Sequence, residues 1–183
     1  MVNKMLLFVG NLFDDVPMGN MPVFGLENRR YLGCKSKLAE WILSIINNEA
    51  QGAYSFFDIF AGTGAIGRKA LEYYQEVIFN DFLCSNVVSY KAFFADGELN
   101  KERVQDFIRE MNNVDASSLD GNYCSHYYGN KYFGMEAAKK IGYIRDEIER
   151  RKNEFSEKEY FVLVASLIYS ADRIANTPGQ FEA

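Results

Sequence analysis

One stretch, from Ser55 to Gly67, constrains the fold more than any other part of the sequence. It begins with an apolar run rich in Phe and Ile, breaks at Ala-Gly-Thr-Gly, and then places Ile66, Ala70 and Leu71 at helical spacing. Strand, glycine turn and helix together form a site for an adenosine-containing cofactor, because the glycines let backbone N–H groups approach the ligand and the helix presents its N-terminus to it. The stretch predicts an α/β fold with a cofactor-binding turn.

Two classes of cofactor fit this turn, and a turn without any ligand is the third interpretation. Gly62, Gly64 and Gly67 match the G-x-G-x-x-G pattern of nicotinamide and flavin sites, and Asp81 follows at about the distance expected of a ribose-binding acid. Asp58 argues against such a site, because a carboxylate inside the strand would repel a pyrophosphate. It would attract the cationic amino-acid end of S-adenosylmethionine, which we therefore favour over NAD.

The composition limits the partners that the chain can have. With 183 residues, of which 48% are hydrophobic, the chain can form one compact domain, and its net charge of −5 excludes a uniformly basic nucleic-acid coat while permitting a local basic face. One histidine and three scattered cysteines provide neither an ordinary zinc site nor a disulfide framework, so no metal is expected. No apolar run reaches the length of a membrane span, and we expect a cytoplasmic protein without a membrane partner.

The segment from Arg29 to Leu38 carries four basic residues and no acid, with a glycine near its middle. It is either a solvated turn or a loop whose Lys35 meets a carboxylate or a phosphate. Ser36 is predicted to cap the helix that follows, in which Trp41 and Ile45 belong to an apolar face.

Residues 77–79 are predicted to form a second strand that ends just before Asp81 and Phe82. An acid at the carboxyl end of a second parallel strand is placed to bond both hydroxyls of a ribose, and Phe82 could cover the adenine. Ser85 is then expected to cap the next helix, and residues 101–111 form another amphipathic helix.

The character of the chain changes at Asn112, where a polar loop precedes an aromatic segment around Lys131. A helix with basic residues follows, and Ser156 with Glu159 forms a capping box for a last helix over residues 157–174. A basic helix beside aromatic side chains either contacts a nucleic-acid backbone or is an ordinary solvated face. The candidate DNA contacts are Lys131, Lys139, Lys140 and Arg145.

In their order and spacing, these segments resemble the Dam-like family of adenine-specific DNA methyltransferases found in restriction–modification systems. The similarity reaches from about residue 29 to the end of the sequence. It is carried by Arg30–Leu38, Phe57–Gly64, Asn80–Phe82, Ala137–Arg145 and Ala171–Thr177. The resemblance implies a partial Rossmann-like methyltransferase fold that uses S-adenosylmethionine, with a mainly helical C-terminal insertion, and double-stranded DNA as the substrate.

The resemblance also implies a division of the chain and a set of cofactor contacts. Residues 1–28 would be an N-terminal extension, residues 29–112 the cofactor-binding half of the methyltransferase domain, and residues 113–183 the start of a target-recognition region. In the family, the basic loop binds the methionine part of the cofactor, the glycine turn wraps it, and the acid after the second strand binds the ribose. The candidate cofactor contacts are Tyr31, Lys35, Asp58, Phe60, Gly62, Gly64, Asp81 and Phe82.

The family's catalytic loop, Asp-Pro-Pro-Tyr or a close variant, has no counterpart in this sequence. Its three prolines are Pro17, Pro22 and Pro178, and none has a proline neighbour. Because that loop holds the flipped adenine, we assign no catalytic residue and expect a truncated or split chain that is inactive alone. The alternatives are a catalytically silent module that binds DNA or a partner, and an NAD-type oxidoreductase.

The first strand, residues 56–60, has only one predicted neighbour, residues 77–79. A central apolar strand with an unpaired edge is a template for association. We expect this edge to pair with a separately encoded catalytic half, with a second copy, or with another segment of the chain, for which residues 6–9 are the candidate strand.

Overall fold

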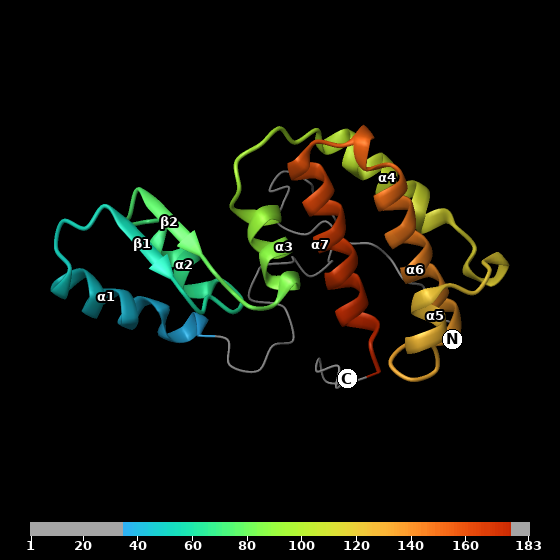
Figure 1. Cartoon of the computed structure of the whole chain (residues 1–183), viewed down its shortest axis with the longest axis horizontal. Helices are drawn as coiled ribbons and strands as arrows, with labels where there is room; N and C mark the ends of the chain where they lie inside the picture. Colours follow the sequence, from blue (N-terminus) through green and yellow to red (C-terminus); the bar gives the residue numbers. More distant parts are fainter. Residues whose placement is uncertain (1–34, 177–183) are drawn as a thin grey trace, which may run out of the picture.

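The described chain starts with a small α/β unit and continues with helices only (Figure 1). This computed structural model describes residues 35–176. Its elements are, in order, η2 (Ser36–Leu38), α1 (Ala39–Glu49), β1 (Ser55–Asp58), α2 (Ala65–Ala70), β2 (Glu76–Phe79), α3 (Cys84–Phe93), α4 (Lys101–Asn113), η3 (Ala116–Ser118), α5 (Tyr123–Tyr128), α6 (Met135–Arg150), η4 (Lys152–Glu154) and α7 (Glu157–Ile174). The predicted strand at residues 6–9 and the candidate contact Tyr31 lie outside the described residues.

The two strands are parallel neighbours, connected through α2. The paired residues are Ser55 with Glu76, Phe56 with Val77, Phe57 with Ile78, and Asp58 with Phe79. Side chains alternate between the two faces of a strand, so Phe56 and Val77 share one face and pack there with Leu43 of α1 and Ala70 of α2. The opposite face carries Phe57 and Ile78, which are both exposed. Among residues 35–176, β1 and β2 make up the whole sheet.

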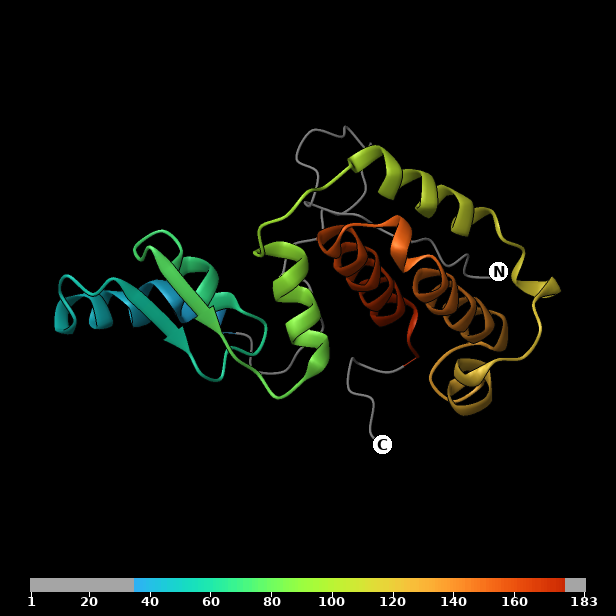
Figure 2. The same ribbon diagram turned by 45° about the horizontal axis from the view of Figure 1, so that its top comes forward.

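The helices from α3 onward have a hydrophobic core of their own. In Figures 1 and 2 the sheet, α1 and α2 lie at one end of the molecule and α4 to α7 at the other, with α3 between them. The helix α7 packs against α3, α4 and α6. The buried core residues are Ala92, Val104, Phe107, Ile108, Met111, Ile144, Ile148, Val162, Leu163, Ala165 and Leu167. This core therefore combines helices from both sides of residue 112, where the domain boundary was predicted.

At a coarse level the architecture agrees with the α/β prediction, because a small parallel sheet is combined with many helices. In the described part of the chain, no helix is both long enough and apolar enough to cross a membrane. Residues 35–176 also contain no group of His, Cys, Asp and Glu side chains that could hold a metal ion.

Of the three predicted helix caps, the structure confirms one and contradicts two. The capping box is confirmed at α7, where the Glu159 N–H donates to Ser156 Oγ at 3.1 Å and the Ser156 N–H donates to Glu159 Oε2 at 2.8 Å. The predicted caps Ser36 and Ser85 are wrong, because α1 starts after Leu38 and α3 after Leu83, neither with a side-chain cap. A 3-10 turn leads into α1. The start of α3 is set from outside the helix by the carboxylate of Asp81, which accepts the Leu83 N–H at 2.9 Å.

Glu159 does more than cap α7, since it is fully buried and also accepts from the N–H of Asn100 at 2.8 Å and from Arg103 Nη1 at 3.1 Å. Replacing Glu159 with Ala removes the acceptor of the Asn100 N–H and leaves Arg103 Nη1 with only the Glu154 carbonyl, at 3.2 Å. We expect the substitution to lower the free energy of unfolding by about 3 kcal/mol, measured by urea denaturation.

The matched control is Glu157→Ala, in the same first turn of α7. Glu157 is exposed and forms an ion pair with Lys91 at 3.0 Å, so its loss should lower the free energy of unfolding by only about 0.5 kcal/mol. Equal effects of the two substitutions would contradict the structural role of Glu159.

Candidate functional site

The glycine turn between β1 and α2 has the backbone conformation that only glycine adopts readily. Gly62 and Gly64 have φ angles of +57° and +79°, in the left-handed region. The N–H of Ala61 donates to the carbonyl of Asn80 at 2.9 Å, which fixes the turn against the end of β2. Gly67 has a different role, because a Cβ atom there would overlap the ring of Phe79. Gly67 therefore allows close packing of α2 on β2, which is the role of the third glycine in G-x-G-x-x-G turns, so this position does not distinguish the cofactor classes.

The carboxylate of Asp81 joins this turn to α3. Its Oδ2 accepts the N–H of Gly62 at 2.8 Å, and its Oδ1 accepts the N–H of Leu83 at 2.9 Å and Nδ2 of Asn86 at 3.0 Å. Burial raises the pKa of Asp81, but these three donors outweigh burial and hold the pKa below its usual value. The Tyr90 hydroxyl adds a second connection by donating to the carbonyl of Gly62.

Asp58, at the end of β1, has a buried carboxylate oxygen without a protein partner. Its Oδ2 accepts no hydrogen bond in the described structure. Burial raises the pKa of Asp58; the N–H groups of Phe60 and Gly67 and the charge of Lys35 oppose this effect, and the charge of Asp81 adds to it. An unpaired buried acceptor is unfavourable, so this oxygen is suited to a cationic or hydrogen-bonding ligand.

A cavity of about 240 Å³ opens at the glycine turn and brings together four of the predicted cofactor contacts. They are Lys35, Phe60, Gly62 and Asp81, and the remaining lining residues are Ala61, Thr63, Ala65 and Ile66. The side chains of Phe60 and Phe82 are 84% and 97% exposed. Whole-ligand sites usually measure about 300–1,000 Å³, so this cavity could enclose only part of a cofactor-sized ligand. Asp58, Gly64 and Phe82 are not among the lining residues.

The four candidate DNA contacts do not form one group. Lys140 is only 5% exposed, and its Nζ donates to the carbonyls of Asn112 and Val114 at 3.0 Å each, which ties α6 to the end of α4. The other three have more surface, but each has a protein partner. Lys131 Nζ lies 4.8 Å from the ring centre of Tyr132, Lys139 Nζ donates to the Leu119 carbonyl at 2.6 Å, and Arg145 Nη1 lies 3.4 Å from Glu149 Oε2.

Sequence reasoning missed α5 and a second cavity that it forms with α6. The aromatic segment was identified by composition, but not as a helix. The signal was present: Asn122 and Ser125 form a capping box at the start of α5, in the spacing of Ser156 and Glu159. The usual capping box has Ser or Thr at the N-cap and Glu or Gln three residues later. Asn122 followed by Ser125 is therefore a weaker sequence signal than Ser156 followed by Glu159.

The bonds of Asp81 predict a pH effect on stability. Its folded-state pKa lies below the ordinary value of about 4, so its contribution is complete above about pH 4 and is lost as the pH falls through the folded-state pKa. In Asp81→Asn the free energy of unfolding should therefore depend less on pH between about pH 5 and pH 2 than in the wild type. Denaturation at a series of pH values measures this. Superimposable pH profiles would exclude the proposed contribution of Asp81.

Comparison with known proteins identifies the family. The chain matches the D12 class of N6 adenine-specific DNA methyltransferases over residues 31–183. The type II methyltransferase M.CviAII of Paramecium bursaria Chlorella virus 1 is 35% identical over 156 residues, which cover 80% of this chain and 46% of that protein. The type II methyltransferase M.NlaIII of Neisseria lactamica is 33% identical over 166 residues, which cover 84% and 48%.

A third relative, the type II methyltransferase M.FokI of Planomicrobium okeanokoites, is 30% identical over 169 residues, which cover 84% of this chain and 26% of that protein. The chain thus spans about half the length of the first two relatives and about a quarter of the third. No solved structure matches the chain. The match over residues 31–183 confirms the resemblance found in the sequence: this chain belongs to the D12 class of N6 adenine-specific DNA methyltransferases.

Proposed function

We propose that these residues form the cofactor-binding part of an S-adenosylmethionine-dependent DNA adenine methyltransferase of the restriction–modification type. The observation that carries the proposal is the unpaired buried oxygen of Asp58, in the electrostatic field of Lys35 and Asp81, both of which line the cavity at the glycine turn. A ligand with a cationic amino group supplies the missing partner, and an amino-acid end of this kind distinguishes S-adenosylmethionine from NAD.

The residues at the turn suit the parts of this cofactor. Lys35 and Asp58 carry opposite charges and would bind the carboxylate and ammonium of its methionine end. A carboxylate offers about four acceptor positions, of which Asp81 uses three, so it retains room for a ribose hydroxyl. Gly62 and Gly64 would let the backbone approach the cofactor, and the exposed rings of Phe60 and Phe82 would cover it. When bound, the cofactor supplies the activated methyl group for transfer to the adenine amine.

The surroundings of the sheet support a larger, Rossmann-like fold. One face of β1 and β2 is covered by α1 and α2, whereas Phe57 and Ile78 on the other face are exposed. In a doubly wound fold helices cover both faces of the sheet. We therefore propose that further strands and helices, outside residues 35–176, complete this sheet.

Double-stranded DNA is the proposed substrate, and residues 113–183 the proposed start of the region that recognises it. Of the predicted phosphate contacts, Lys131, Lys139 and Arg145 have the surface for such a role. Lys140 is proposed to be structural instead, because its amino group is buried against two backbone carbonyls. The nicotinamide alternative is disfavoured by Asp58, because a carboxylate at the end of β1 would repel a pyrophosphate at the glycine turn.

The cofactor assignment predicts opposite effects of Asp58→Asn on binding and on stability. We expect S-adenosylhomocysteine to bind the variant about tenfold or more weakly, because a charged hydrogen bond is lost. The melting temperature should not fall, because Asp58 Oδ2 has no hydrogen bond within the protein to lose. Calorimetric titration and thermal unfolding measure the two effects on one sample.

Two further measurements sharpen this test. Asp81→Ala should lower both affinity and stability, because its carboxylate also joins the glycine turn to α3. Asp146→Asn, an exposed carboxylate on α6, is the control for both measurements. Unchanged binding in Asp58→Asn would remove this residue from the site, and binding of NAD in place of S-adenosylhomocysteine would replace the methyltransferase proposal with the oxidoreductase.

A separate prediction concerns catalysis. The 183 residues contain no Pro-Pro pair, so this chain offers no Asp-Pro-Pro-Tyr loop to hold the adenine amine. We expect the chain alone to transfer no labelled methyl group to mixed-sequence duplex DNA, even where it binds the cofactor. Incorporation above that of the Asp58→Asn variant would show that another segment holds the adenine.

A further inference from the structure

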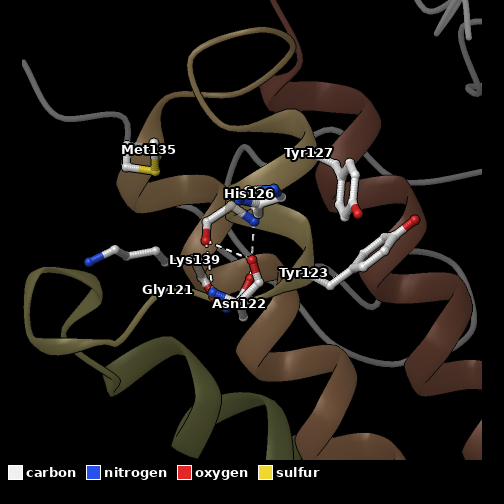
Figure 3. Close-up of a pocket in the computed structure, with 8 residues that line it drawn as sticks. Gly121, Asn122, Tyr123, His126, Tyr127, Met135 and Lys139 are labelled. Atoms are coloured by element: carbon white, nitrogen blue, oxygen red, sulfur yellow. Dashed lines mark hydrogen bonds between the residues drawn. The ribbon is translucent and has the colours of Figure 1, made fainter.

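A second cavity, of about 510 Å³, lies between α5 and α6 and is separate from the glycine turn (Figure 3). The residues that matter for its chemistry are Asn122, Tyr123, His126, Tyr127, Met135 and Lys139. Figure 3 shows the two tyrosines on one side of His126, with Met135 and Lys139 on the other. No Asp or Glu lines this cavity, although the chain as a whole is acidic.

Hydrogen bonds and close packing hold α5 against α6 beneath the cavity. A helix as short as α5 is not stable alone, and its start is held by the capping box of Asn122 and Ser125. Asn122 Nδ2 also donates to the Lys139 carbonyl at 2.7 Å, and Lys139 Nζ donates to the Leu119 carbonyl at 2.6 Å. A Cβ atom at Gly142 would overlap the side chain of Asn122, so α5 and α6 are in close contact.

The solvent-facing side of α5 carries aromatic rings that do not pack in the hydrophobic core. Its inward side chains, including Cys124 and Tyr128, pack with the buried Tyr132 and Phe133. Tyr123 and Tyr127, in contrast, are 69% and 56% exposed, and their ring centres are 4.5 Å apart.

The exposed rings form one group. The ring of His126 meets that of Tyr127 edge-on at 4.8 Å. Tyr128 raises the pKa of Tyr123, through its charge and a hydrogen bond, which keeps that phenol neutral. Three aromatic rings are therefore in mutual contact at the rim of the cavity.

We infer that this cavity binds an unstacked nucleobase of the DNA substrate. The choice of DNA as the ligand rests on the proposed function, whereas the existence of a binding site rests on the cavity and its aromatic rings. A base offers a π-face for the rings of Tyr123 and Tyr127, and its edge has donors and acceptors that suit a phenol or an imidazole. Lys139 uses one of its three donors within the protein and keeps two for a neighbouring phosphate.

The volume and the charge favour a nucleobase over a peptide. About 510 Å³ falls within the range of about 300–1,000 Å³ that small-ligand sites occupy. A carboxylate in the lining would repel the phosphates that flank a base, and none is present. Stacking on aromatic rings tolerates every base, so this contact would strengthen binding without itself fixing the target sequence.

The test compares three DNA probes on the complete chain by fluorescence anisotropy: a short single strand of mixed sequence, its duplex, and an abasic strand of the same length. We expect the single strand to bind more tightly than the abasic strand. Replacing Tyr123 and Tyr127 together with Ala should weaken single-strand binding about fivefold to a hundredfold, whereas replacing both with Phe should preserve it. Tyr54→Ala, at the start of β1 and 63% exposed, is the matched control.

Two outcomes would overturn the inference: equal binding of the single strand by wild type and the double Ala variant, or equal binding of base-bearing and abasic strands by the wild type. Thermal unfolding confirms that each variant is folded, which is expected because both rings are exposed. Titration with S-adenosylhomocysteine separates the two proposals. If the chain binds S-adenosylhomocysteine but its DNA binding does not depend on Tyr123 and Tyr127, only the nucleobase site is rejected. If DNA binding depends on these rings but S-adenosylhomocysteine does not bind, only the proposed cofactor site is rejected.

Discussion

The carboxylate of Asp81 connects the two parts of the described chain. It accepts from Gly62 in the glycine turn and from Leu83 and Asn86 at the start of α3. Because α3 packs against α7 and contributes Ala92 to the helical core, one side chain links the sheet unit to the helices. The conformation of the turn, and so the shape of the cavity beside it, depends on this carboxylate being charged and correctly placed.

The two acids at this site differ in how far the protein itself satisfies them. Asp81 is almost saturated by protein donors, whereas Asp58 keeps a buried oxygen without a partner. The first acid stabilises the turn before any ligand arrives. The second has one buried oxygen without a hydrogen bond, which is unfavourable in the protein alone and is the feature on which the proposed cofactor contact rests.

The parts of the fold that sequence predicted are those that depend on neighbouring residues. The capping box of Ser156 and Glu159 needs four consecutive residues, and the strand–turn–helix at the glycines needs a short continuous segment. The cap prediction at Ser85 was wrong because α3 already begins at Cys84, after Leu83, whose N–H is held by the carboxylate of Asp81. The position of Asp81 depends on how the end of β2 packs against the glycine turn, and this tertiary contact cannot be read from the neighbouring residues.

The candidate site was predicted to a similar extent. Lys35, Phe60, Gly62 and Asp81 were expected together and do line one cavity, although their roles remain a proposal. Lys140 could not be distinguished from Lys139 by sequence, because adjacent positions on a helix differ in direction and only the packing of α4 decides which one is buried. The sequence shows that the segment of α5 is rich in aromatic residues. Which of these rings are exposed depends on the face of α5 that packs against α6, and the sequence does not determine that face.

These arrangements suggest how an acidic chain can contribute to DNA binding. Lys139, Lys140 and Arg145 each have a protein acceptor; Lys140 is also buried, whereas Lys139 and Arg145 retain further donors for a phosphate. The exposed rings of Tyr123 and Tyr127 contact each other but keep solvent-exposed surface, and stacking does not depend on releasing counterions. Electrostatic attraction to phosphate weakens steeply with salt, whereas ring contacts do not. The proposed nucleobase contact of α5 would therefore depend less on salt concentration than the proposed phosphate contacts of α6.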